Sequence, residues 1–98
     1  MKITADIHIV PIGNGVSLST EIAQCGKILR EAGLKTQLHA YGTSVEGDWD
    51  AVFAAVKKCH QSLHDSGTQR ISTSIKVGSR TDKDESLEGR IQSVDSKS

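Results

Sequence analysis

Apolar and polar residues alternate along three stretches of the chain, which predicts three half-buried β-strands. These stretches span residues 2–10, 35–41 and 69–77. Gly42 permits a tight turn after the second stretch, and residues 43–47 then form the short second arm of a hairpin with Val45 pointing inward. The inward-facing positions of the three longer strands are Ile3, Ala5, Ile7, Ile9, Leu38, Ala40, Ile71, Thr73, Ile75 and Val77.

Two segments between these strands carry apolar residues at a spacing of three to four, which predicts amphipathic helices. The apolar stripe of the first helix is Leu18, Ile22, Cys25, Leu29 and Ala32. The stripe of the second helix is Trp49, Val52, Phe53, Val56, Cys59 or His60, and Leu63. The expected capping and terminating residues are Ser17 or Ser19 with Gly33, and Asp48 or Asp50 with Gly67. A further short helix is expected from Ser86, with Leu87, Ile91 and Val94 on one side.

The order strand, helix, strand, strand, helix, strand leaves few topologies, because connections are short and crossovers are right-handed. The common arrangement is the split βαβ, or ferredoxin-like, sheet. We therefore expect an α+β, ferredoxin-like βαββαβ sandwich, with two helices on one face of an antiparallel sheet of order 4-1-3-2. The chain is interpreted as one domain over residues 1–98, with a core at about 2–78 and a polar tail with the short helix at 79–98.

The charge balance narrows the class of partner. Lys and Arg number 12, and Asp and Glu number 12, so the formal net charge is zero. This balance argues against nucleic-acid binding and against electrostatic anchoring to a membrane, since both need an excess of basic residues. Near-zero charge permits self-association, and exposed strand edges in a small domain favour pairing with a second copy. We expect a homodimer, or a homotetramer made of two dimers.

The two cysteines, Cys25 and Cys59, fall among apolar residues of the predicted helices. Their spacing is not that of a zinc site, and we interpret them as small buried hydrophobic residues in preference to a disulfide. The N-terminus carries no long apolar run, so neither a signal peptide nor a transmembrane segment is expected. A cytoplasmic protein in a reducing compartment is the expectation that follows.

The sheet face opposite the helices has no cover within the predicted fold. One interpretation is a solvated face, which antiparallel sheets commonly have. The other is a face that packs on another subunit and encloses a polar site, where Glu46 would need a cationic or N–H-rich partner. By strand parity this face carries Asp6, His8, His39, Tyr41, Ser44, Glu46, Ser72, Ser74 and Lys76.

The sequence contains no specific motif for catalysis or metal binding. Residues 13–17 form a glycine-containing segment before a helix, but they match neither a P-loop nor GxGxxG and are interpreted as a plain turn. His8 and His39 with Asp6 are the residue types of a two-His–carboxylate metal site, yet the strand of Glu46 separates the two histidines. There is no GxSxG elbow. We therefore assign no catalytic residue and no metal ligand.

Four segments along nearly the whole chain carry a family resemblance. They are Val10-Pro11-Ile12-Gly13 with Ser17 and Ser19, Gly42-Thr43-Ser44-Val45-Glu46-Gly47 with Trp49, Arg70-Ile71, and Gly78-Ser79-Arg80-Thr81-Asp82-Lys83. In this order and spacing the chain resembles the MTH1187/YkoF-like family of small thiamine-binding proteins, UPF0045. The resemblance implies a ferredoxin-like fold, a tetramer of two dimers, and binding of thiamine or its hydroxymethylpyrimidine part by some members. It also gives the charged tail motif at 80–83 a structural role in subunit contacts.

Carried over onto matching positions, the resemblance assigns ligand binding to Ile12, Ser19, Thr43 and Glu46. Thiamine or a related pyrimidine is the expected ligand, and no cofactor is required. The chemistry agrees, because a carboxylate such as Glu46 can hydrogen-bond the aminopyrimidine or offset the thiazolium charge. A hydroxyl such as that of Ser19 or Thr43 can meet the amino group or a ring nitrogen of the pyrimidine. Tyr41 or Trp49 could stack on a ring, although core packing is the favoured role of Trp49.

The leading hypothesis from the sequence is a non-catalytic binder of thiamine or a related pyrimidine at a subunit interface. One alternative is an enzyme acting on a small metabolite through Glu46 with His8 or His39. Another is a purely structural or regulatory homo-oligomer without a small ligand.

Overall fold

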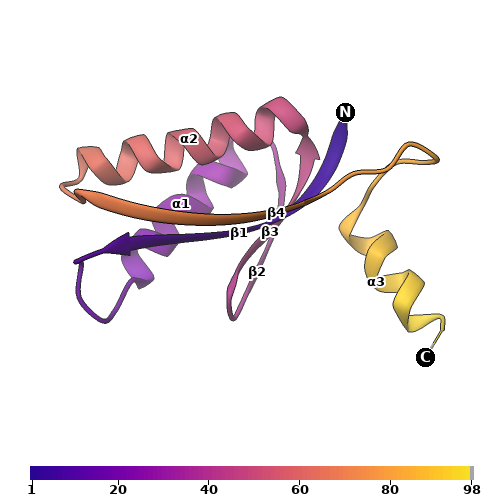
Figure 1. Cartoon of the computed structure of the whole chain (residues 1–98), viewed down its shortest axis with the longest axis horizontal. Helices are drawn as coiled ribbons and strands as arrows, with labels where there is room; N and C mark the ends of the chain where they lie inside the picture. Colours follow the sequence, from indigo (N-terminus) through magenta and orange to yellow (C-terminus); the bar gives the residue numbers. More distant parts are fainter. Residues whose placement is uncertain (98) are drawn as a thin grey trace.

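Four strands form a sheet with two helices packed along it, and a third helix stands at one end of the molecule (Figure 1). This computed structural model describes residues 1–97, so the last residue of the expected tail, Ser98, lies outside the described residues. The elements are β1 (Lys2–Ile12), α1 (Ser19–Glu31), β2 (Lys35–His39), β3 (Gly42–Asp48), α2 (Trp49–Asp65), β4 (Arg70–Gly78) and α3 (Leu87–Asp95). Their order is βαββαβ followed by a short helix, as the hydrophobic pattern predicts.

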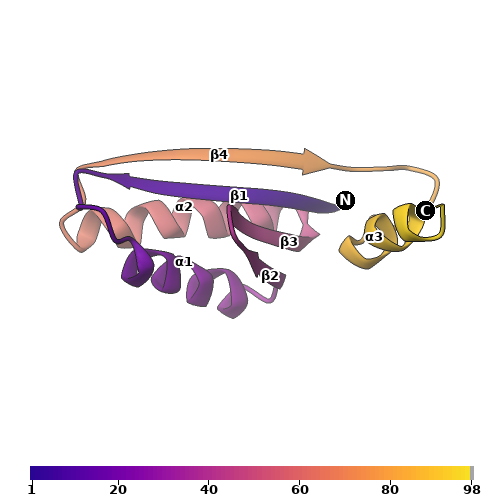
Figure 2. The same ribbon diagram turned by 90° about the horizontal axis from the view of Figure 1, so that it is seen from below.

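The sheet has the strand order β2-β3-β1-β4, and all neighbouring strands are antiparallel. This is the predicted order 4-1-3-2 counted from the other edge. The view from below shows both α1 and α2 on one side of β1 and β4 (Figure 2). The prediction of a ferredoxin-like α+β sandwich is therefore confirmed.

The core lies between the sheet and these two helices, and it is built almost entirely from aliphatic side chains and two cysteines. Full burial of a side chain the size of leucine or isoleucine contributes about 1.5–3 kcal/mol, so a small set of such residues supports the fold. The buried residues of the core are Ile3, Ala5, Ile7, Cys25, Leu29, Leu34, Val45, Val52, Ala55, Cys59 and Leu63. The alternating positions of β1 and the stripes of both helices supply most of them, as predicted.

Most helix ends follow the signals in the sequence. Asp48 caps α2, because its side chain accepts a hydrogen bond from the backbone N–H of Asp50 at 3.2 Å. Gly33 and Gly67 follow the last turns of α1 and α2 with φ angles of +82° and +104°. Glycine adopts this left-handed conformation without steric cost, so these two residues end the helices where the sequence predicts.

The expected serine cap of α1 is wrong. Leu18 occupies the N-cap position and makes no side-chain capping hydrogen bond. The reason is a shift in the start of the helix, since Ser19 is already its first residue and Ser17 lies beyond the cap position. The start of α1 is instead tied down by Asn14 in the preceding loop, as described below.

The position of the hairpin turn also differs from the prediction. Ala40 and Tyr41 form the turn between β2 and β3, whereas Gly42 is already the first residue of β3. Glycine is needed at that position for close approach, because a Cβ atom there would lie 2.6 Å from the carbonyl oxygen of Ile7. Tyr41 therefore belongs to the tip of the hairpin and not to the uncovered sheet face.

Helix α3 begins at the predicted place, because the Ser86 side chain accepts a hydrogen bond from the N–H of Gly89 at 2.9 Å. Its expected apolar stripe contributes no residue to the core: Ile91 and Val94 are exposed. Along the described part of the chain, no helix has the length and apolarity that a membrane span requires.

Candidate functional site

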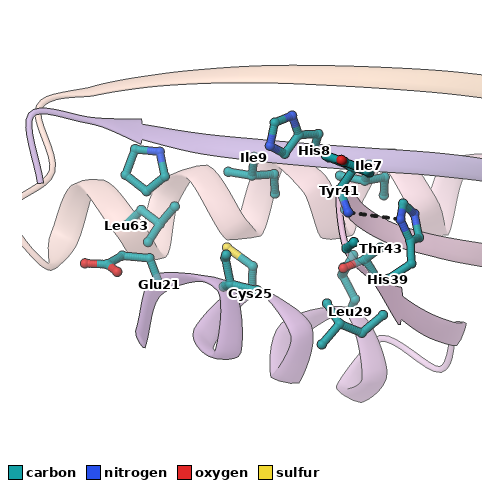
Figure 3. A pocket seen from close by; sticks show the side chains of 15 residues that line it. Ile7, His8, Ile9, Glu21, Cys25, Leu29, His39, Tyr41, Thr43 and Leu63 are labelled. Carbon is teal, nitrogen blue, oxygen red and sulfur yellow. Dashed lines mark hydrogen bonds between the residues drawn. The ribbon is translucent and has the colours of Figure 1, made fainter. Parts of the chain in front are cut away.

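Strand β1 extends beyond its pairing with β3, and a cavity lies at this place. β1 pairs with β4 over residues 4–12 but with β3 only over residues 2–7. The rest of β1 therefore has no β3 partner along one edge, next to the β2–β3 hairpin. A cavity of about 100 Å³, here named cavity 1, is lined by this part of β1, the hairpin, α1 and one residue of α2 (Figure 3).

The walls of cavity 1 combine many apolar side chains with a few polar groups. The apolar lining residues are Ile7, Ile9, Pro11, Ile22, Cys25, Leu29, Leu38, Ala40 and Leu63. Thr43 contributes a hydroxyl on the helix-covered side of the sheet, because it is paired with Ile7 and Leu38 in the strand register. Apolar walls with few polar groups are typical of a small-molecule site.

Glu21 is the unusual polar group of cavity 1. Its Oε1 accepts a hydrogen bond from Nδ2 of Asn14 at 3.4 Å, whereas its Oε2 is buried and has no hydrogen-bond partner among residues 1–97. Asn14 also donates to Oγ1 of Thr68 at 2.8 Å, which holds the β1–α1 loop against the segment after α2. A buried polar atom without a partner is costly, so the Oε2 atom is suited to receive an N–H group or a positive charge.

Exposed apolar side chains surround the opening of cavity 1. Leu38 and Tyr41 of the hairpin are 69% and 83% exposed, and Ile22 of α1 is 44% exposed. The backbone N–H of Tyr41 donates to Nδ1 of His39 at 3.3 Å, which joins the hairpin tip to the last residue of β2. We name Ile22, Leu38 and Tyr41 the rim. Clustered apolar side chains of this kind mark a surface suited to a ligand or a second chain.

The uncovered sheet face is polar, as predicted, and two of its side chains from non-adjacent strands contact each other. Nε2 of His39 on β2 lies 2.6 Å from Oδ1 of Asp6 on β1, across the intervening strand β3. Within the described residues, His, Cys, Asp and Glu side chains form no group of three or more that could hold a metal ion.

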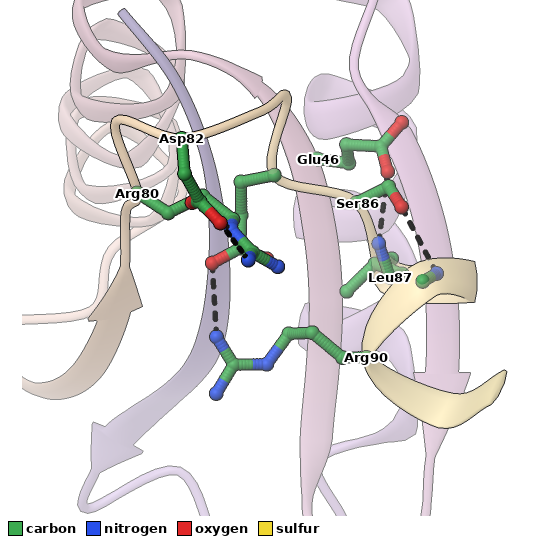
Figure 4. A network of polar contacts seen from close by, with 8 residues as sticks. Glu46, Arg80, Asp82, Ser86, Leu87 and Arg90 are labelled. Atoms are coloured by element: carbon green, nitrogen blue, oxygen red, sulfur yellow. Dashed lines mark hydrogen bonds and ion pairs between the residues drawn. The ribbon is translucent and has the colours of Figure 1, made fainter. Parts of the chain in front are cut away.

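Glu46 lies on this face, which α1 and α2 leave uncovered, and contacts the start of α3 (Figure 4). Contrary to the expectation from the sequence, α3 therefore covers part of the face within the chain. Its Oε1 accepts a hydrogen bond from the backbone N–H of Leu87 at 2.9 Å, and its Oε2 lies 3.7 Å from Nζ of Lys2. The N–H groups at a helix start lack partners within the helix, and an anionic side chain near them is stabilising. Glu46 therefore anchors α3 to the sheet in this structure.

The charged motif that precedes α3 is held together by internal contacts. Nε and Nη2 of Arg80 donate to the two carboxylate oxygens of Asp82 at 2.6 and 2.5 Å. This hydrogen-bonded pair lowers the pKa of Asp82 to about 2 and raises the pKa of Arg80. Arg90 of α3 then donates to the buried carboxylate of Glu85 at 3.0 Å. These two pairs order the connection between β4 and α3.

A second cavity, cavity 2, lies between α3 and the uncovered face and measures about 280 Å³. Two of its three charged lining residues already have partners: Asp6 contacts His39, and Arg90 contacts Glu85. Its lining residues are Thr4, Ala5, Asp6, Ser44, Lys76, Val77, Gly78, Leu87 and Arg90. Cavity 2 is therefore more polar than cavity 1 and lacks its unpaired buried carboxylate oxygen.

The structure does not gather all the ligand-binding residues expected from the resemblance. Thr43 lines cavity 1, whereas Ile12 and Ser19 lie exposed at the two ends of the β1–α1 connection, and Glu46 lies on the opposite sheet face. The residue that joins Thr43 at cavity 1 is Glu21, which the sequence analysis missed. An acidic residue in the first turn of a helix is ordinary, because it complements the helix dipole, so no local signal marked Glu21.

The structure also shows where Trp49 and the two cysteines lie. Trp49, expected in the core, is 41% exposed and packs on Phe53 with ring centroids 4.9 Å apart. Its position at the start of α2 leaves only part of the ring covered, and it lines neither cavity 1 nor cavity 2. Cys25 and Cys59 are both free and buried, which confirms their interpretation as core residues.

Known proteins resemble this chain over most of its length. Residues 5–95 match the sequence model of the family described as thiamine-binding protein. A UPF0045 protein of Synechocystis sp. is 48% identical over 95 residues, which cover 97% of this chain and 78% of that protein. The UPF0045 protein ECM15 of Eremothecium gossypii is 36% identical, over 94% of this chain and 89% of that protein.

Solved structures show the same fold. The protein MJ1052 of Methanocaldococcus jannaschii superposes with a TM-score of 0.90 at 29% identity, over 96% of each chain. A candidate thiamine biosynthesis or salvage protein of Thermotoga maritima superposes with a TM-score of 0.82 at 19% identity, over 96% of this chain and 99% of that one. The match to the family model and the identity to its members together show that this chain belongs to the UPF0045 family of thiamine-binding proteins.

Proposed function

We propose that this protein is a non-catalytic, cytoplasmic binder of thiamine or its hydroxymethylpyrimidine part, and that the pyrimidine ring occupies cavity 1. Membership of a family described as thiamine-binding supports a small-molecule-binding role. The observation that carries the assignment to cavity 1 is the buried, unpaired Oε2 of Glu21 at one end of the cavity, with the hydroxyl of Thr43 towards the other end (Figure 3).

The chemistry of an aminopyrimidine suits these two groups. Its exocyclic amino group donates hydrogen bonds, and its ring nitrogens accept them. Oε2 of Glu21 can accept from the amino group, and the Thr43 hydroxyl, towards the other end of the cavity, can donate to a ring nitrogen on the far side of the ligand. When the flat ring enters between the apolar walls, it gives up hydrogen bonds to water. These polar contacts replace most of them.

The size of cavity 1 supports binding of one ring rather than the whole thiamine molecule. A single water needs about 10–15 Å³ of such space, so a cavity of about 100 Å³ holds the equivalent of several waters. The thiazolium ring of thiamine would then lie at the opening, beside the exposed rim. A second copy of the chain packed on the rim would complete the site, in keeping with the expected homodimer or homotetramer.

Glu46 has a different role in this proposal from the one expected from the resemblance. Its carboxylate is engaged by Leu87 and lies on the other face of the sheet from Thr43. Ile12 and Ser19 flank the loop that leads into α1 and stay predicted contacts for the part of the ligand outside cavity 1. The enzyme alternative is not favoured by any contact, because His39 is bonded to Asp6 and Glu46 to Leu87.

Isothermal titration calorimetry with thiamine and with hydroxymethylpyrimidine tests the proposal. Glu21→Gln replaces a charged acceptor and is expected to weaken binding roughly 10- to 100-fold, and Thr43→Val by roughly 2- to 10-fold. Glu31→Gln is the matched control, because Glu31 lies on the same helix, is exposed and forms an ion pair with Lys27 at 3.9 Å.

Two results would contradict this assignment. Absence of heat and of a thermal shift at millimolar ligand would reject binding of either compound by this protein. Binding that is unchanged in Glu21→Gln and Thr43→Val but lost in Glu46→Gln would move the site to the uncovered face. Product formation in the same samples, followed by mass spectrometry, would favour the enzyme alternative.

A further inference from the structure

Two buried cysteines are in contact between α1 and α2, and one of them, Cys25, lines cavity 1. Cys25 of α1 is 6% exposed and Cys59 of α2 is fully buried, and both are free. Sγ of Cys59 lies 3.7 Å from the backbone carbonyl oxygen of Cys25, which places the two cysteines in direct contact. The two cysteines lie 34 residues apart in the chain, and the packing of α1 on α2 makes them a pair.

The two sulfur atoms differ in access. Cys25 lines cavity 1, whose opening lies at the rim, whereas Cys59 does not line it and is fully buried. A small reagent that enters cavity 1 therefore reaches the sulfur of Cys25 first. The reagent can reach Cys59 only through a bond already made to Cys25.

The two thiols also differ in acidity. The hydrogen bond from Cys59 lowers the pKa of Cys25, although burial and the negative charge of Glu21 act in the opposite direction. The same hydrogen bond, together with burial, raises the pKa of Cys59. The thiolate is the reactive form of cysteine, so access and acidity both make Cys25 the attacking group.

We propose that Cys25 and Cys59 are an oxidisable dithiol that a low-molecular-weight disulfide entering cavity 1 converts into a disulfide bond between α1 and α2. In the first step the Cys25 thiolate attacks one sulfur of the reagent, which forms a mixed disulfide and expels one thiolate that takes up the Cys25 proton. In the second step Cys59 loses its proton and attacks the Cys25 sulfur, and the second thiol leaves. Two electrons pass from the protein to the reagent, and two thiols are released.

Oxidation and ligand binding then compete for one space. A ring in cavity 1 covers the Cys25 sulfur and is expected to slow its reaction. This consequence rests on the proposed function, whereas the dithiol reaction itself needs no ligand.

The dithiol is tested on the full-length protein with 2,2′-dithiodipyridine, which releases coloured thiopyridone at each step, and with oxidised glutathione. The wild-type chain is expected to release two thiopyridones and to lose the mass of two hydrogens. Peptide mapping should locate the new bond between Cys25 and Cys59. The unfolding temperature of the oxidised protein should rise by several degrees, because the bond closes a loop between the helices. Cys59→Ser should stop at a mixed disulfide, and Cys25→Ser should react far more slowly.

Several outcomes would overturn the dithiol. The first is a wild-type chain whose reaction stops at the mixed disulfide. The second is a folded chain that does not react although the urea-unfolded chain does. The third is an equal reaction rate for Cys25→Ser and Cys59→Ser. The shared space is tested by repeating the wild-type reaction with saturating hydroxymethylpyrimidine, once calorimetry has shown binding. A rate unchanged by bound ligand would overturn the competition but leave both the dithiol and the binding function standing.

Discussion

His39 contacts Asp6 from two strands away, and Gly42, on the strand between them, carries no side chain. A Cβ atom at this position would lie 3.6 Å from Oδ1 of Asp6 and 2.6 Å from the carbonyl oxygen of Ile7. The second distance is shorter than real Cβ contacts allow, and the blocking atom belongs to the backbone. Gly42 thus fixes how closely β3 approaches β1, on the strand that also carries Thr43.

This close approach predicts that Gly42→Ala destabilises the protein. The added methyl group must push β3 away from β1, and overpacking of this kind costs about 1–3 kcal/mol. Urea unfolding followed by circular dichroism measures the change. Gly26→Ala is the control, because its new Cβ meets only the flexible end of Arg30, at 3.3 Å. Helix propensity makes that control more stable by up to about 1 kcal/mol, and equal stability of the two variants would contradict the prediction.

The Arg80–Asp82 pair predicts a local response to acid. Asp82 has a pKa of about 2 in the folded chain, below its ordinary value of 3.8. A carboxyl group whose pKa is lower when folded supports the fold above its unfolded pKa, and this support is lost as the pH falls from about 4 towards 2. We expect NMR titration to give a midpoint near 2 for Asp82 and a return towards 3.8 in Arg80→Ala. A midpoint near 3.8 in the wild type would show that the pair does not persist in solution.

At the scale of elements, α3 is attached to the sheet by polar contacts and buries none of its own residues. Glu46 accepts from the N–H of Leu87, and Lys35 of β2 forms an ion pair with Glu88. This pair raises the pKa of Lys35 and lowers the pKa of Glu88. Exposed ion pairs contribute little, so the partly buried contact at Glu46 is the stronger candidate for holding the helix.

Replacement of Glu46 by alanine is expected to loosen α3 while the core stays folded. The Leu87 N–H loses its acceptor, and loss of such a contact at a helix start costs about 1 kcal/mol. Amide hydrogen exchange in α3 should become about fivefold faster, because that energy corresponds to such a change in the opening equilibrium. Exchange in β1 should not change. Glu31→Ala serves as the control, and unchanged exchange in α3 of the Glu46 variant would contradict the anchoring role.

For the whole molecule, the uncovered surfaces point to assembly. The strands β2 and β4 are both sheet edges, and the rim of cavity 1 leaves Leu38 and Tyr41 largely exposed. Unpaired edges and apolar patches are sites of association in small domains, and a net charge of zero offers no repulsion between copies. A second copy on the rim would bury apolar surface and close cavity 1 in the same contact.

Light scattering coupled to size exclusion is therefore expected to give the mass of a dimer or a tetramer. Leu38→Glu combined with Tyr41→Glu places charges in the proposed contact and should shift the protein towards the monomer while its circular dichroism is unchanged. Gln61→Glu, an added charge on the exposed side of α2, should leave the mass as it is. A wild-type monomer would reject assembly, and a double variant with the wild-type mass would place the contact elsewhere.

The sequence alone predicts the fold because the evidence for it is local. Alternation in β1 and β4, the helical spacing of Cys25 and Leu29, and the glycines that end α1 and α2 all act within a few residues of chain. The sheet order follows from these elements through general rules on connections. Resemblance in short segments added the family, which the comparisons show.

Tertiary structure decided where the chemistry lies, because side chains far apart in the chain meet only through register and packing. Cavity 1 depends on β1 extending beyond β3, which no local pattern encodes. In the sequence Glu21 is an ordinary residue at a helix start, and only the fold buries its Oε2. Glu46 is an ordinary strand residue in the sequence, and only the fold brings α3 into contact with it. The pairing of Cys25 with Cys59 likewise exists only because α1 packs on α2.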